Sequence, residues 1–163
     1  MPIFTANTAA NYLIGTSAGD LIFADAGDDT LVGLEGNDSL NGGDGQDTVV
    51  EQGKLRDYSI SLDLGNGTVK DSVAGRDGTD TLTSIEHIRF SDFDINTGIK
   101  AVASSVDTAT LQRVIELYVA FFNRVPDADG LSYWLGQSKA GTSTNAIAEA
   151  FYGAGVQYSS LTG

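Results

Sequence analysis

The N-terminal half of the chain carries an aspartate at every ninth position, and this period constrains the fold more than any single residue does. The four aspartates are Asp20, Asp29, Asp38 and Asp47. Residues 15–50 divide into the nonapeptides GTSAGDLIF, ADAGDDTLV, GLEGNDSLN and GGDGQDTVV, in which a glycine or alanine precedes each aspartate by two positions and an aliphatic residue follows it by two. A fixed period with several phases locked to it is the signature of a repeat architecture.

Each nonapeptide predicts a six-residue loop followed by a three-residue strand. Glycines in the loop permit positive φ and close backbone approach. The aliphatic residue at the eighth position points inward, while its two neighbours point outward. Two nonapeptides then complete one turn of a right-handed parallel solenoid, so loops on the same edge are eighteen residues apart. We therefore expect Asp20 to stack on Asp38, and Asp29 to stack on Asp47 along the opposite edge.

Stacked aspartates indicate a cation site. Neighbouring strands lie about 4.8 Å apart, a spacing at which two carboxylates repel each other and which is about twice a calcium–oxygen bond of roughly 2.4 Å. Calcium accepts six to eight hard oxygen ligands in flexible geometry, whereas magnesium requires a tighter octahedron. Zinc is disfavoured because the chain has no cysteine and a single histidine, His87. An isolated aspartate in such a loop would be a turn former, but four at one period favour two or more calcium ions.

The nonapeptides resemble the hemolysin-type calcium-binding repeats of RTX proteins, over residues 15–50 and again over GRDGTDTLT at 75–83. The resemblance implies a parallel β-roll with calcium ions between same-edge loops, and export from a Gram-negative bacterium by type I secretion. Alanine replaces glycine at positions 18 and 24, which implies weaker sites in the first two repeats. Asp80 matches the motif locally but is out of register with the main run, so its partner is left open. The metal-binding residues that follow are Asp20, Asp29, Asp38, Asp47, Asp80, Gly15, Gly27, Gly33, Gly36, Gly42 and Gly45.

The segment after the repeats predicts strands that close the solenoid. Residues 55–73 alternate apolar and polar side chains around Gly65-Asn66-Gly67, which is typical of a β-hairpin. Residues 84–93, SIEHIRFSDF, predict a final strand at the end of the stack. His87 lies in that strand without an acid or nucleophile at catalytic spacing, and we interpret it as structural or surface-exposed.

Helical patterns begin where glycine and aspartate become scarce, near residues 96–107. Asp107 or Thr108 is placed to cap a helix whose apolar residues recur at helical spacing as far as Val125-Pro126. Two shorter helices are expected after it, at about 131–137 and 144–152. The fold class predicted is α+β and multidomain, with an N-terminal parallel β-roll (an RTX solenoid) capped by a hairpin and strand. The expected division is a β-roll at 1–98, a linker at 99–107 and a small all-α domain at 108–163.

One run in the helical part, LYVAFFNRVPDADGLSYWLGQ, resembles the DUF4214 family. That family is a helical domain of bacterial surface and secreted proteins, and it has no assigned biochemical function. The matching positions are Arg124, Pro126, Asp127, Gly130, Tyr133 and Trp134.

The acidic turn in this run, Asp127-Ala128-Asp129-Gly130, invites an EF-hand interpretation. In that register position 1 would be Val125 and position 12 would be Gly136, so the first ligand and the bidentate glutamate are both missing. Asp127 or Asp129 is better explained as a helix cap. Tyr133 and Trp134 are better explained as core residues, with stacking on a sugar as the alternative.

Composition excludes several classes of protein. With nine Lys and Arg against 22 Asp and Glu, and a net charge of −13, the chain has no basic stripe for nucleic acid. No run approaches the roughly 20 apolar residues of a membrane span, and MPIFTANTAANYLIG lacks the features of a signal peptide. The absence of cysteine excludes disulfides and Cys nucleophiles, and 41% hydrophobic residues in periodic order argue against disorder.

The function expected is that of a calcium-binding module, folded by calcium, in a secreted or cell-surface RTX-type protein, with a structural or adhesive role. One alternative is a C-terminal targeting and stabilising module of a type I-secreted hydrolase. Another is a module that binds a surface glycan or another surface protein through the helical domain. Catalysis is not expected, because the chain has no HExxH motif, no GxSxG motif and no paired acid and base on a suitable scaffold.

Overall fold

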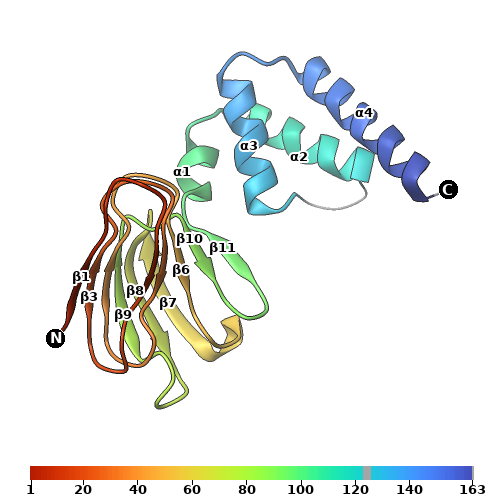
Figure 1. The fold of residues 1–163 in the computed structure, drawn as a ribbon. Helices are drawn as coiled ribbons and strands as arrows, with labels where there is room; N and C mark the ends of the chain where they lie inside the picture. Colours follow the sequence, from red (N-terminus) through yellow and green to blue (C-terminus); the bar gives the residue numbers. More distant parts are fainter. Residues whose placement is uncertain (123–125, 163) are drawn as a thin grey trace. The chain divides into compact units, whose positions relative to one another are not determined.

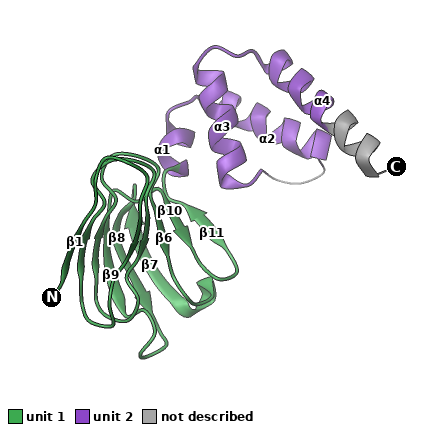
Figure 2. Ribbon diagram, in the orientation of Figure 1, with its two compact units in different colours: residues 1–98 green, residues 99–163 purple. Residues whose placement is uncertain are grey.

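The computed structural model describes residues 1–122 and 126–162, with side chains described as far as residue 154. The chain divides into two compact units, Met1–Gly98 and Ile99–Gly163 (Figure 2). Arg124, one of the residues matched to the DUF4214 pattern, lies outside the described residues.

The first unit consists of two sheets, and its first six strands alternate between them along the chain (Figure 1). The six-stranded sheet contains, in order, β1 (Ile3–Thr5), β3 (Leu21–Phe23), β5 (Ser39–Asn41), β9 (Thr79–Thr83), β8 (Asn66–Asp71) and β7 (Tyr58–Asp63). The five-stranded sheet contains β11 (Asp94–Asn96), β10 (His87–Arg89), β6 (Thr48–Val50), β4 (Thr30–Val32) and β2 (Tyr12–Ile14). Each nonapeptide thus contributes one strand, and consecutive strands belong to opposite sheets.

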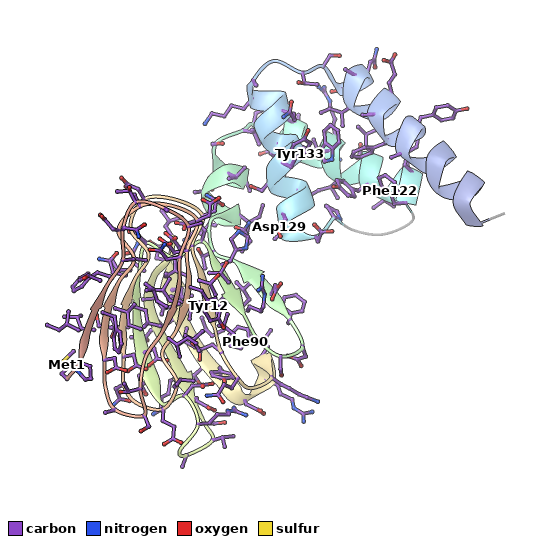
Figure 3. All side chains as sticks on the ribbon, in the orientation of Figure 1. Met1, Tyr12, Phe90, Phe122, Asp129 and Tyr133 are labelled. Atoms are coloured by element: carbon purple, nitrogen blue, oxygen red, sulfur yellow. The ribbon has the colours of Figure 1, made fainter. Side chains whose placement is uncertain are left out.

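The strand register confirms the offset of eighteen residues. Ile22 in β3 pairs with Leu40 in β5, and Leu31 in β4 pairs with Val49 in β6, both in parallel. These four aliphatic side chains occupy the eighth position of their nonapeptides and are at most 1% exposed. The other buried core residues of the unit are Ala24, Val69, Leu82, Ile85, Ile88 and Phe90, the last of which is labelled in Figure 3.

The two sheets are mixed, which corrects the expectation of a parallel roll with a hairpin and strand only as its cap. Four strands are parallel in each sheet, β1-β3-β5-β9 in one and β2-β4-β6-β10 in the other. β8 and β7 then add in antiparallel fashion to β9, and β11 adds in antiparallel fashion to β10. The antiparallel strands arise because β7 and β8 form a hairpin within the chain, between β6 and β9, and join the sheet beside β9.

Two details of the closing segment also differ from the sequence prediction. The hairpin turn is Leu64-Gly65, with φ of 50° and 78°, rather than Gly65-Asn66-Gly67. Two consecutive positive φ angles match the twist of a two-residue hairpin loop, which leaves Gly67 free to pair with Leu62. Residues 84–93 do not form one capping strand, because β10 continues the parallel set and β11 closes the sheet.

The second unit is helical. Its helices are α1 (Ile99–Ser104), α2 (Thr108–Phe122), α3 (Ala128–Lys139) and α4 (Thr144–Thr162). The expected linker at 99–107 is therefore mostly helix, because Val102, Ala103 and Val106 pack against the core of this unit. The core residues are Val114, Tyr118, Leu135, Ile147 and Phe151.

The helix caps follow the sequence prediction. The Oδ1 atom of Asp107 accepts a hydrogen bond from the backbone N–H of Thr110 at 3.0 Å, and that of Asp127 accepts one from the N–H of Gly130 at 2.7 Å. Asp127 is thus the N-cap of α3, which is the role that the sequence favoured over an EF-hand ligand.

The two aromatic residues of α3 have different environments. The Trp134 ring packs edge-on against Phe151, with centroids 4.9 Å apart, and belongs to the core. Tyr133, labelled in Figure 3, is 59% exposed. The pair therefore does not present two rings on one exposed face.

Candidate metal centre

The first column of acidic residues runs along one edge of the roll through Asp20, Asp38 and Asp80. The Oδ1 atom of Asp38 accepts a hydrogen bond from the backbone N–H of Asp20 at 2.8 Å. The Oδ1 atom of Asp80 accepts the N–H of Asp38 at 2.8 Å. Asp80, whose partner the sequence left open, therefore stacks below Asp38 although it lies 42 residues later.

The second column runs along the other edge through Asn11, Asp29, Asp47 and Glu86. Asp29 Oδ1 accepts the N–H of Asn11 at 2.6 Å, and Asp47 Oδ1 accepts the N–H of Asp29 at 2.9 Å. Glu86 Oε2 completes the series by accepting the N–H of Asp47 at 2.9 Å. The sequence analysis missed Glu86. Glu86 lies directly before β10, as Asp47 lies directly before β6, and this position is the signal that could have identified it.

The second carboxylate oxygen of the inner aspartates has no partner. Among the described residues, Asp29 Oδ2, Asp38 Oδ2 and Asp47 Oδ2 are buried without a hydrogen bond. Asp20 differs, because its carboxylate accepts hydrogen bonds from the backbone and hydroxyl of Thr16 in its own loop. A buried carboxylate oxygen without a partner destabilises the folded state. These three atoms are therefore candidates for binding a cation.

Glycines at the first position of the nonapeptide make room for these oxygens. A Cβ atom built on Gly33 would overlap Asp38 Oδ2, and one built on Gly42 would overlap Asp47 Oδ2. Gly15 stands in the same relation to Asp20 Oδ2, with a separation of 2.6 Å. The glycines thus allow the backbone at the start of each loop to lie close to the carboxylate at its end.

The charges of the columns are unfavourable without a cation. Burial, with the nearby charges of Glu86 and Asp29, raises the pKa of Asp47 to about 6. Burial and the charges of Asp38 and Asp77 raise the pKa of Asp80 to about 8. Burial also raises the pKa of Asp38. A cation beside Asp38, Asp47 and Asp80 would stabilise the ionised forms of these three carboxylates.

The donor set fits calcium. It consists of carboxylate oxygens with free lone pairs and of the carbonyls of tight glycine loops, which are hard oxygen ligands of the kind that calcium takes. In the part of the chain that the structure describes, no group of three or more His, Cys, Asp or Glu side chains converges to hold a metal. The acids are instead spread along two columns, so that carbonyls must supply the remaining ligands of each ion.

The glycines at the fourth position are required by backbone geometry. Gly27, Gly36 and Gly45 have φ of 120°, 143° and 148°. The second position also has positive φ, but there the chain carries Asp25 at 70° and Leu34 at 69°. Side chains at positive φ cost of order 1 kcal/mol, so the earlier loops are more strained than the loop that contains Gly43.

Stacked loops lie too close to each other for a side chain between their backbones. Comparing alanine substitutions at Gly78 and Gly75 tests this. A Cβ atom built on Gly78 would overlap the carbonyl oxygen of Gly36 in the loop above, whereas one built on Gly75 would meet nothing within 4 Å. Both glycines have positive φ, 88° and 73°. Gly75→Ala should cost about 1 kcal/mol, and Gly78→Ala should cost several kcal/mol more through overpacking. Denaturant unfolding in saturating calcium checks this, and equal costs would contradict close loop stacking.

The comparison with family models matches residues 7–49 to the RTX calcium-binding nonapeptide repeat, in four copies. The match begins at residue 7, upstream of the first nonapeptide at 15–23, and stops before 75–83. No curated protein matches the chain. The resemblance of the helical unit to the DUF4214 family stays a prediction.

Among solved structures, the chain is similar to the extracellular lipase LipA from Serratia marcescens. The two share 20% identity with a TM-score of 0.50, over 55% of this chain and 14% of the lipase chain. At this identity the likeness concerns the fold alone, and this chain spans a small part of the lipase's length. The buried acidic columns lie in and beside residues 7–49, the segment that matches the RTX calcium-binding nonapeptide repeat.

Proposed function

We propose that this chain is a calcium-binding module of a secreted or cell-surface RTX-type protein, and that its first unit folds when calcium binds. The observation that carries the proposal is the set of unpaired, buried oxygens on Asp29, Asp38 and Asp47. Each lies in a column of stacked acids within the segment that matches the RTX calcium-binding repeats.

The residues have separate roles in this module. Asp29, Asp38 and Asp47 would hold calcium through Oδ2, while their Oδ1 atoms fix the loop above through its backbone N–H. Asp20 and Asp80 would complete the first column. Bound calcium supplies the positive charge that offsets the repulsion between stacked carboxylates. The glycines keep the loops close enough for both contacts.

Calcium binding would be coupled to folding, so the folded state of the first unit would depend on whether the protein is in the cytosol or outside the cell. Because the columns do not exist in the unfolded chain, the free energy of binding becomes free energy of folding. At the low calcium concentration of cytosol the acidic repeats would stay unfolded, and at extracellular calcium they would fold. This behaviour suits export before folding, by type I secretion. Among the described residues, no helix is both long and apolar enough to cross a membrane.

We further propose that the module is structural or adhesive and not catalytic. The acids that the structure brings together are used as hydrogen-bond acceptors between loops. A targeting and stabilising role for an attached hydrolase is compatible with the same chemistry. A glycan site at Tyr133 and Trp134 is less favoured, because the Trp134 ring is packed in the core.

Calorimetric titration of the full chain with calcium tests the proposal. We expect binding of at least two ions, because each column contains at least one stacked pair of aspartates. Magnesium at the same concentration should bind much more weakly, since it prefers a rigid octahedron and retains its waters. A chain that takes up no calcium, or that does not distinguish calcium from magnesium, would contradict the proposed function.

A further inference from the structure

Glu51 occupies the position of a repeat glycine at the end of the first column. It directly follows β6, as Gly15 follows β2 and Gly33 follows β4, with steps of eighteen residues. The repeat then departs from its period, because the hairpin β7–β8 is inserted before Asp80 and β9. Glu51 and Asp80 therefore begin and end one composite loop, as Gly33 and Asp38 begin and end the loop above.

This position faces the acid at the end of its own loop. A Cβ atom built on Gly33 would overlap the carboxylate of Asp38, so a side chain at the equivalent position is directed at the equivalent acid. In the last loop these two residues are Glu51 and Asp80. The negative charge of Asp80 is, after burial, the largest cause of the raised pKa of Glu51.

The Glu51 carboxylate is buried and incompletely paired. The residue is 3% exposed, and its Oε1 atom has no hydrogen-bond partner. Asp80 is 2% exposed. Within the described part of the chain, neither residue forms an ion pair of 4 Å or less with a basic side chain.

The surrounding groups are already engaged with each other. Arg76 holds Asp71 through two hydrogen bonds of 2.6 Å. Both oxygens of Asp77 accept hydrogen bonds, from the backbone and side chain of Gln52 and from the Tyr58 hydroxyl. Arg76 is thus paired with Asp71. The Asp77 side chain lies within hydrogen-bond reach of Glu51 and adds to the rise of its pKa, but as another acid it brings no positive charge to the Glu51 carboxylate.

We propose that Glu51 and Asp80 hold a further calcium ion at the end of the first column, outside the matched repeats. The inference rests on the proposed calcium-binding function and extends it to a composite loop. Glu51 supplies a carboxylate where the two loops above it in the first column have Gly15 and Gly33, so this site has one more negative charge than the sites above it. Glu51 is the residue that distinguishes it.

Counting bound ions by native mass spectrometry of the full chain tests this proposal. Glu51→Gln keeps the size of the side chain and removes its charge. We expect E51Q to bind one calcium ion fewer than the wild-type protein. The matched control is Glu35→Gln, which makes the same change at an exposed residue on the same edge. E35Q should bind the wild-type number.

The outcomes separate this inference from the proposed function. If the wild-type protein binds calcium and E51Q binds the same number with the same affinity, Glu51 is not a ligand and only this inference fails. If the wild-type protein binds no calcium, the proposed function fails as well.

A measurement on the wild-type protein decides the matter if E51Q does not fold. Infrared spectra of the calcium-loaded protein at pH 7, with and without ¹³C-glutamate, report whether a glutamic acid is protonated. We expect no protonated C=O band that shifts with the label. Such a band would show that Glu51 is satisfied by a proton instead of a cation, and would overturn the proposal.

Discussion

Removing calcium with a chelator should abolish the strand contribution of residues 1–98 to the far-UV circular dichroism, while the helical contribution of the second unit remains. The first unit contains the acidic columns, whereas the second has a hydrophobic core of its own around Val114, Leu135 and Phe151. A site filled at 100 times its dissociation constant contributes about 2.7 kcal/mol, so two sites contribute about 5 kcal/mol. That is comparable with the whole stability of a small domain.

Acid should replace part of the effect of calcium in the chelated protein. The pKa of Asp47 is raised to about 6 and that of Asp80 to about 8 in the folded state, against about 3.9 in an unfolded chain. Between these values the folded state binds more protons, so its stability falls as the pH rises from about 4 to about 8. Lowering the pH from 8 towards 4 should therefore restore strand signal without calcium.

Two controls make the calcium experiment specific. Magnesium added to the chelated protein should not restore the strand signal. Adding back calcium should restore it fully, since binding and folding are coupled. A strand signal that is the same with and without calcium at pH 7 would show that the first unit folds without the ion.

Asp38→Asn should have opposite effects with and without calcium. Asp38 is the central residue of the first column, and both Asp20 and Asp80 are hydrogen-bonded to it. In calcium, loss of its charge weakens binding, and loss of one site filled at 100 times its dissociation constant costs about 2.7 kcal/mol. Without calcium the same change removes a buried charge whose pKa is raised by burial and by Asp20 and Asp77. D38N should then be at least as stable as the wild-type protein.

Urea unfolding in calcium and in chelator measures both effects on the same proteins. The control is Asp44→Asn, which makes the same change at an exposed residue of a repeat loop and should alter stability by less than about 0.5 kcal/mol in either condition. Asparagine keeps an oxygen that can accept the N–H of Asp20, so D38N removes the charge of Asp38 but not this hydrogen bond. Equal destabilisation of D38N in calcium and in chelator would therefore show that the Asp38 charge does not bind calcium, and would contradict the proposed role of this residue.

The stacked pairs within residues 15–50 were predictable, because two repeats of nine residues make one turn and residues eighteen apart must therefore stack. Asp20 with Asp38 and Asp29 with Asp47 follow from the offset of eighteen, which the strand register confirms. The inward aliphatic residues follow in the same way. Local patterns also sufficed for the capping residues of the helices, since a cap depends on neighbours three positions away.

Contacts beyond the insertion were not predictable from the period. Asp80 lies 42 residues after Asp38 and Glu86 lies 39 after Asp47, because the hairpin changes the spacing without changing the stacking. The nonapeptide match at 75–83 marks β9 as a repeat strand, but no local sequence signal shows that β9 is the strand that pairs with β5. α1 was missed because its helix is short and its residues gain their stability from the second unit's core.

The hydrogen-bond ladder between the acids has a direction, and this direction bears on how such a roll can change length. In every rung the carboxylate belongs to the later residue and the N–H to the earlier one. Each turn of eighteen residues therefore presents an acceptor to the turn before it and a donor to the turn after it. Duplication or deletion of one whole turn within 15–50 leaves every junction chemically identical, whereas a change of nine residues exchanges the two sheets for everything downstream. The lengths accessible to this architecture are thus spaced by two nonapeptides.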